Sequence, residues 1–145
     1  MKVNKLTQLT NIGAISVIKK AGLRPTRQRI GLAKLLFKAQ DRHVTAEELH
    51  VEARAAGVSV SLATVYNALH QFTQAGLMRE VVVEAGQSYF DTNTDEHHHF
   101  YHLGTGILTD IPVDRICLSK SPELPPGTML SRIDVTVRIV DKIGK

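Results

Sequence analysis

The sequence has 145 residues, of which 43% are apolar and 22% charged, and it contains a single cysteine. This is ordinary for a folded protein of one compact domain or two small ones. No apolar stretch reaches the roughly 20 residues that a membrane span needs, and the first residues lack the features of a signal peptide. We therefore expect a cytoplasmic protein with no membrane partner. The single Cys117 excludes an internal disulfide and a structural zinc site built on paired cysteines, and we expect it to be a small buried residue.

The net charge of +4 is unevenly distributed along the chain. Residues 1–85 contain twelve lysines and arginines against six acidic residues, whereas residues 86–145 contain six against eight. A basic first part joined to a mildly acidic second part indicates that the first part meets a polyanion. Charge alone does not identify that polyanion as nucleic acid.

Three helical patterns follow one another in the first part of the chain. Gly22 and Pro25 separate the first pattern from the second, and Thr26 is placed to cap the second. The third begins at Thr45, which forms the capping box T-x-x-E with Glu48. Gly57 ends it. Apolar residues of the last two patterns recur at helical spacing and are expected to be buried: Ile30, Ala33, Leu36, Phe37, Leu49, Ala53 and Ala56.

A fourth helix is predicted between Ser61, a suitable N-cap, and Gly76, a left-handed stop. Its apolar stripe consists of Leu62, Val65, Leu69 and Phe72. Its opposite face carries Thr64, Asn67, Gln71 and Gln74, with Tyr66 and His70 on the flank. Because residues 53–79 include no carboxylate, this face can lie against DNA phosphates and base edges without repulsion.

Residues 78–91, MREVVVEAGQSYFD, have the pattern of a strand, a glycine turn and a second strand. A hairpin at this place is the wing of a winged helix, because helix, helix, recognition helix and hairpin is the order of that fold. We predict an α+β protein whose N-terminal winged helix-turn-helix DNA-binding domain spans residues 1–92. The alternative is a helical core with a polar face that binds nothing.

Residues 93–145 change to short strands and loops with four prolines, at Pro112, Pro122, Pro125 and Pro126. The stretch GILTDI (106–111) is a candidate strand. In RIDVTVRIV (132–140) apolar and polar residues alternate, with Ile133, Val135, Val137 and Ile139 on one side, as in a half-buried strand. A part of about 50 residues is too small to build a confident core alone, so we expect it to pair with another copy.

The stretch TDEHHHFYHL (94–103) contains four of the seven histidines, directly after two carboxylates. The run is interior and too short for a purification tag. A solvated loop could carry it at little cost, but imidazole is the commonest metal-binding side chain and also an axial haem ligand. In an extended strand, His97 and His99 point to one side and His98 to the other.

The stretch SLATVYNALHQFTQAGLMREV, with IKKAGLRPTRQR before it and HVTAEELH between them, resembles the Fur family of metal-responsive transcriptional regulators. The resemblance covers nearly the whole chain and implies a winged helix followed by a small α/β dimerisation domain, here residues 93–145. It also implies a set of sensory metal ligands: His43, Asp91, His97, His99 and Asp110. Imidazoles and carboxylates suit Fe(II), Mn(II) or Zn(II), and an ion that bridges the two domains could set their relative orientation.

Two departures from the family pattern affect this interpretation. Where most members have C-x-x-C for structural zinc, this chain has His102, Gly104 and Thr105, so that zinc site is absent. Asn67 replaces the arginine that often follows the tyrosine of TVY. A triple histidine without C-x-x-C resembles the Irr subfamily of iron response regulators, which implies that haem binds at His97, His98 and His99 and weakens DNA binding. The Cys-Pro haem motif of some members is missing, because Leu118 follows Cys117.

We therefore predict a homodimeric transcriptional regulator of iron and haem metabolism that reads AT-rich, partly palindromic double-stranded DNA. Tyr66 and Thr64 are expected to contact bases, Ser61 and Asn67 bases or backbone, Arg24 the minor groove, and Arg27 and Arg29 phosphates. The first alternative is a Fur-type metal or peroxide sensor that does not use haem. The second is a hydrolytic metalloenzyme, which the lack of an H-E-x-x-H motif and of a nucleophile constellation disfavours.

Overall fold

The structure is a computed structural model that describes residues 9–38, 40–84 and 86–143. The chain divides into two compact units, Met1–Thr94 and Asp95–Lys145. Residues 1–8 lie outside the described residues, so the expectation that the chain begins without a signal peptide falls outside them. Ala85, the last residue of the basic first part of the chain, also lies outside them. Among the helices of the described part, none combines the length and the apolar character that a membrane crossing requires.

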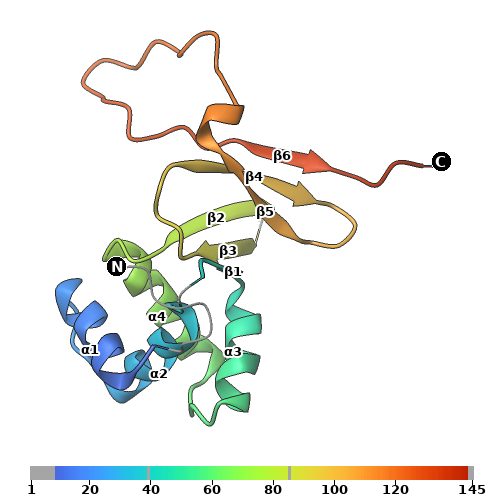
Figure 1. The fold of residues 1–145 in the computed structure, drawn as a ribbon. Helices are drawn as coiled ribbons and strands as arrows, with labels where there is room; N and C mark the ends of the chain where they lie inside the picture. The colour runs from blue at the N-terminus through green and yellow to red at the C-terminus, as the bar shows by residue number, and fades with distance from the viewer. Residues whose placement is uncertain (1–8, 39, 85, 144–145) are drawn as a thin grey trace. The chain divides into compact units, whose positions relative to one another are not determined.

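Four α-helices form most of the first unit: α1 (Asn11–Lys20), α2 (Arg27–Leu36), α3 (Ala46–Ala55) and α4 (Leu62–Gln74) (Figure 1). Each begins after a hydroxyl residue whose side chain accepts a hydrogen bond from the backbone N–H three residues later. These N-caps are Thr10, Thr26, Thr45 and Ser61. The predicted caps of the last three helices are therefore confirmed, because each hydroxyl satisfies an N–H that has no partner within the helix.

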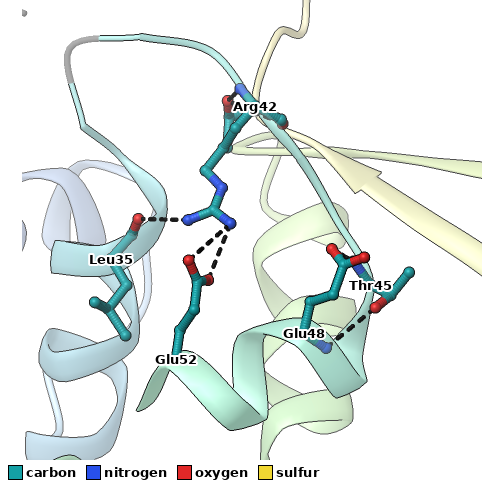
Figure 2. Close-up of polar contacts among 6 residues, drawn as sticks. Leu35, Arg42, Thr45, Glu48 and Glu52 are labelled. Carbon is teal, nitrogen blue, oxygen red and sulfur yellow. Dashed lines mark hydrogen bonds and ion pairs between the residues drawn. The ribbon is translucent and has the colours of Figure 1, made fainter. Parts of the chain in front are cut away.

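The capping box of α3 is complete: Glu48 N donates to Thr45 Oγ1 at 3.1 Å and Thr45 N donates to Glu48 Oε2 at 3.2 Å (Figure 2). We expect Thr45→Ala to lower the free energy of unfolding by about 1 kcal/mol, because one backbone N–H loses its acceptor. Urea denaturation followed by circular dichroism measures this loss. Thr45→Ser, which keeps the hydroxyl, should retain most of the stability, and equal losses in both variants would contradict the capping role.

A three-stranded antiparallel sheet completes the first unit, with strand order β1-β3-β2. Its strands are β1 (His43–Val44), β2 (Arg79–Glu84) and β3 (Gln87–Asp91). The predicted hairpin is confirmed: β2 and β3 pair, and Gly86 takes φ +76° in the turn, where a side chain would be strained. The two-residue strand β1 was not predicted.

The core of the first unit lies between the four helices and the sheet, and its fully buried side chains include Ile18, Leu36, Leu49, Phe72 and Phe90. Two residues that we predicted to be buried are exposed. Ala56 follows the last residue of α3 as its C-cap, and Leu62, 36% exposed, is the first residue of α4. Both lie at helix ends, where helical spacing no longer decides which face is covered.

The second unit contains a separate three-stranded sheet of order β5-β4-β6. Its strands are β4 (His97–His102), β5 (Leu108–Pro112) and β6 (Thr136–Ile139), and β4 is antiparallel to β5 and parallel to β6. The buried side chains are Tyr101, Leu108 and Ile111 together with His97, His98 and His99. The strand predicted over 132–140 forms only at 136–139, and Ile139 at the edge strand β6 is 37% exposed.

Residues 113–135 correct two expectations for the second unit. The expected α/β domain has no α-helix among residues 95–143: its only helical element is the 3₁₀ helix Val113–Arg115. Pro122, Pro125 and Pro126 interrupt the segment before β6, and proline removes a backbone donor and clashes within a helix. Cys117, which we expected to be buried, is exposed in this same irregular segment.

Candidate metal centre and nucleic-acid interface

His43 and Asp91 face each other in the first unit. Antiparallel pairing of β1 with β3 puts the two residues directly opposite, and His43 Nε2 lies 3.1 Å from Asp91 Oδ2. The Asp91 side chain is 1% exposed, and its Oδ1 accepts a hydrogen bond from Asn93 N at 2.9 Å. A carboxylate this deeply buried needs a positive partner, since burial of a charge without one is strongly unfavourable. A metal ion bound by both side chains would be such a partner.

His97, His99 and Asp110 converge in the second unit. The β4–β5 register puts His99 opposite Asp110, and the alternation along β4 brings His97 to the same side. Asp110 Oδ1 lies 3.3 Å from His97 Nε2 and 3.5 Å from His99 Nε2. The ligand atoms of the three residues lie within 4.8 Å of one another. The prediction that His97 and His99 point to the same side of the strand is therefore confirmed.

The proton on His97 can be assigned from its neighbours. His97 Nδ1 lies 2.6 Å from the carbonyl oxygen of Asp95, which can only accept a hydrogen bond, so Nδ1 carries the proton. In the neutral ring, Nε2 then presents a lone pair toward Asp110 Oδ1, which is also an acceptor. A cation held between Nε2 and Oδ1 would be bound by both atoms. A hydrogen bond from Nδ1–H to a carbonyl is the usual support for a metal-binding Nε2.

His98 points to the other side of β4 and has a different partner. Its Nδ1 accepts a hydrogen bond from Val135 N at 3.1 Å, and the residue is 8% exposed. In the neutral ring the proton is therefore on Nε2, where it blocks metal coordination. The three histidines do not form one ligand group in this conformation, because only His97 and His99 share a side.

The predicted DNA-contacting residues gather mostly at the start of α4 and the start of α2. Ser61 Oγ accepts from Thr64 N and lies 2.9 Å from Thr64 Oγ1. Arg29 donates to Gln71 Oε1 at 2.7 Å and to the Arg24 carbonyl at 2.9 Å. An open pocket of about 370 Å³ is lined by side chains from both helices, including Arg24, Arg29, Thr64 and Asn67. Arg27 lines a different pocket, of about 540 Å³, with Lys34 and Ser59.

Tyr66 has a partner that the sequence did not reveal. Its hydroxyl donates to Glu47 Oε1 on α3 at 2.8 Å, and its ring stacks on that of His70 with centroids 6.4 Å apart. The hydrogen bond to Glu47, followed by burial and by the charge of that carboxylate, raises the pKa of Tyr66 above its ordinary value. α4 itself has no acidic residue, but α3 brings one to the expected base-reading tyrosine. Helical spacing within α4 holds no signal for this contact.

Known proteins match both the sequence and the fold. The sequence profile of the ferric uptake regulator family matches residues 20–124. The ferric uptake regulation protein of Shigella flexneri is 39% identical over 102 residues, which are 70% of this chain and 69% of that protein. The one from Vibrio cholerae is 35% identical over 100 residues, 68% of this chain and 67% of that protein.

Among solved structures, the ferric uptake regulator of Pseudomonas aeruginosa with manganese aligns with a TM-score of 0.67. The alignment covers 90% of this chain and 98% of that chain at 26% identity. The mixed helix and sheet class that we predicted is thereby confirmed as a Fur-like fold. The chain belongs to the ferric uptake regulator (Fur) family of metal-responsive transcriptional regulators.

Proposed function

We propose that this chain is a homodimeric DNA-binding regulator whose operator affinity depends on a divalent transition metal. The observation that carries the proposal is the convergence of His97 Nε2 and His99 Nε2 on one carboxylate oxygen of Asp110, at 3.3 and 3.5 Å. This arrangement favours a cation. Imidazole and carboxylate donors together suit Fe(II), Mn(II) or Zn(II) rather than Ca(II) or Mg(II), which prefer oxygen ligands alone.

We propose further that His43 and Asp91 complete the coordination of the same ion. Only five residues separate Asp91 from His97. A chain of this length spans at most about 20 Å, so both groups of ligands can reach one ion. Each group already pairs imidazole with carboxylate, and the carboxylates would offset the charge of the ion. Metal binding would then fix the orientation of residues 1–94 relative to residues 95–145, which is how it would favour one DNA-binding arrangement.

The first unit is proposed to be a winged helix-turn-helix, with α4 as recognition helix and the β2–β3 hairpin as wing. The exposed polar positions at the start of α4 and the arginines around α2 support this assignment. Two copies related by two-fold symmetry would place two α4 helices in successive major grooves of an AT-rich, partly palindromic site. Exposed apolar side chains on the second unit, among them Phe100, Ile107 and Val140, support pairing through that unit.

Fluorescence anisotropy on chelator-treated protein tests this function. The operator is first selected from random duplexes with Mn(II)-loaded protein, and a scrambled duplex serves as the control. Addition of Mn(II) should tighten binding to the selected duplex about tenfold or more, within the usual range of allosteric coupling. Equal affinity with and without Mn(II), Fe(II) and Zn(II) would overturn the proposal.

Tyr66 provides a test of the DNA-contacting surface. We expect Tyr66→Ala to weaken binding to the selected duplex by about 1–3 kcal/mol and to reduce discrimination against the scrambled duplex, because a base contact is lost. Arg27→Gln, a proposed phosphate contact, should instead weaken both duplexes alike and flatten the salt dependence of log K by about 0.9. A Tyr66→Ala variant with full discrimination would remove this residue from the interface.

Haem sensing, which the resemblance to Irr implies, remains a second prediction. The histidine run and the lack of C-x-x-C support it, whereas His97 and His99 face one side of β4 and His98 the other. A haem iron has two axial positions, so at most two of the three histidines could bind it. We expect haem to release the wild-type protein from its duplex and to leave a His97, His98 and His99 triple alanine variant bound. If haem changes neither, the metal-sensing alternative stands alone.

A further inference from the structure

The strand that presents His43 is very short, so few of its own contacts fix its register. β1 contains only His43 and Val44, and it pairs with Asp91 and Phe90 at the end of β3. Strands in folded proteins usually have about five or six residues, and a slip of one residue turns every side chain to the other face. A slip here would turn His43 away from Asp91. Burial of Val44 in the core opposes such a slip, and contacts of the preceding residue add to it.

The backbone of Arg42 continues the pairing by one residue. Arg42 N donates to Thr92 Oγ1 at 2.9 Å, and Thr92 N donates to the Arg42 carbonyl oxygen at 3.1 Å. The pair Arg42 and Thr92 thus lies directly beside the pair His43 and Asp91. Movement of Arg42 along β3 would shift His43 by the same amount.

The side chain of Arg42 anchors this end of the strand to two helices (Figure 2). Its Nη1 donates to the Leu35 carbonyl at 3.3 Å, and its Nη2 lies 2.9 and 3.1 Å from the two carboxylate oxygens of Glu52 on α3. Leu35 is in the last turn of α2, where carbonyl oxygens have no partner within the helix and carry partial negative charge. One guanidinium therefore links β1 to the end of α2 and to the middle of α3.

We propose that Arg42 is a positioning residue for the metal ligand His43, with Glu52 as its fixed partner. The inference rests on the proposed metal-dependent function, and it adds a residue that does not itself coordinate the ion. Arg42 and Glu52 hold His43 opposite Asp91 before metal arrives, so that the ion does not have to order the strand. A ligand pair that is already ordered binds more tightly than one that must be ordered on binding.

Charge and position predict opposite results for Arg42→Gln and the same result for Glu52→Gln. Through charge alone, Arg42→Gln would remove a positive group and tighten binding of a cation, whereas Glu52→Gln would remove a negative group and weaken it. Through position, both substitutions weaken metal binding. Because the two side chains are 24% and 38% exposed, solvent screens the charge effect and the positional effect should dominate.

The experiment measures Mn(II) affinity of the full-length protein by isothermal titration calorimetry, without DNA. We expect Arg42→Gln and Glu52→Gln each to weaken Mn(II) binding by about tenfold, the lower end of the effect of groups that support metal ligands. The control Arg54→Gln removes the same charge as Arg42→Gln, at an exposed position two residues after Glu52, and should bind Mn(II) as tightly as the wild type does. The visible spectrum of bound Co(II), which reports ligand geometry, should change in the first two variants and not in the control.

Hydrogen–deuterium exchange without metal supplies a second readout. Residues 41–44 should exchange faster in Arg42→Gln and Glu52→Gln than in the wild type, whereas a role in general stability alone would speed exchange throughout the first unit. If Arg42→Gln does not fold, Arg42→Lys replaces it, because lysine keeps the charge but cannot bridge both partners with a rigid fork. Folded variants that bind Mn(II) as tightly as the wild type does would overturn this inference and leave the proposed function standing. A wild-type protein that binds no divalent ion would overturn the proposed function as well.

Discussion

Replacing His97 and His99 together with alanine is expected to lower Mn(II) affinity on the order of 100-fold or more and to abolish the effect of Mn(II) on DNA binding. The double variant loses two imidazole donors and leaves Asp110 without the Nε2 atoms that now lie 3.3 and 3.5 Å from it. The effect should exceed that of supporting residues, which is about 10–100-fold. Calorimetry gives the affinity, and anisotropy with the selected duplex gives the DNA response.

His98→Asn is the matched control for this prediction. It changes the middle residue of the same run, and the asparagine side-chain oxygen can accept the hydrogen bond that Val135 N now donates to His98 Nδ1. Mn(II) binding should be within about twofold of the wild type, because His98 faces away from the other two rings. If His98→Asn reduced Mn(II) affinity as strongly as the double variant does, the assignment of His98 to the side of β4 opposite His97 and His99 would be wrong.

Phe72→Ala is expected to lower the free energy of unfolding by about 3–5 kcal/mol, because it leaves a cavity among the helices of the first unit. The Phe72 side chain is fully buried, and its ring packs edge-on against Phe37 with centroids 5.7 Å apart. Small domains are stable by only about 5–15 kcal/mol, so this single substitution could leave the first unit largely unfolded at moderate temperature. Urea denaturation followed by circular dichroism measures the loss.

The control for the packing prediction is Ile12→Ala on α1, at a side chain that is 82% exposed. It also removes a large apolar side chain from a helix, and it should change stability by no more than about 0.5 kcal/mol. Comparable losses for Phe72→Ala and Ile12→Ala would show that the burial assigned to α4 is incorrect.

Local signals in the sequence predicted most of the first unit. The caps at Thr26, Thr45 and Ser61 and the turn at Gly86 each depend on residues within three positions of one another, so the sequence contains the whole interaction. β1 could not be predicted in this way. Two residues show no periodicity, and the strand exists only because β3 lies beside it.

Two different kinds of reasoning predicted the residues of the candidate metal centre. Strand alternation alone predicted that His97 and His99 share a side, whereas the selection of Asp110 depended on resemblance to a family. The supporting contacts were not predicted, because Arg42 reaches Leu35 and Glu52 seven and ten residues away through the packing of helices. Cys117 was expected to be buried from the usual behaviour of its residue type, but the irregular segment that contains it is not covered within this chain.

The central strand of the first sheet, β3, would respond differently to insertions at its two ends. Gly86 and the turn lie at one end of β3, and Asp91 lies at the other, paired with His43 on one edge and Arg79 on the other. Insertions in the turn can lengthen or reshape the hairpin tip while Asp91 keeps its register. One residue inserted between Gln87 and Asp91 would instead turn the carboxylate to the opposite face of the sheet. A change in the length of the turn therefore leaves the pairing of Asp91 with His43 intact, whereas a change in the length of β3 does not.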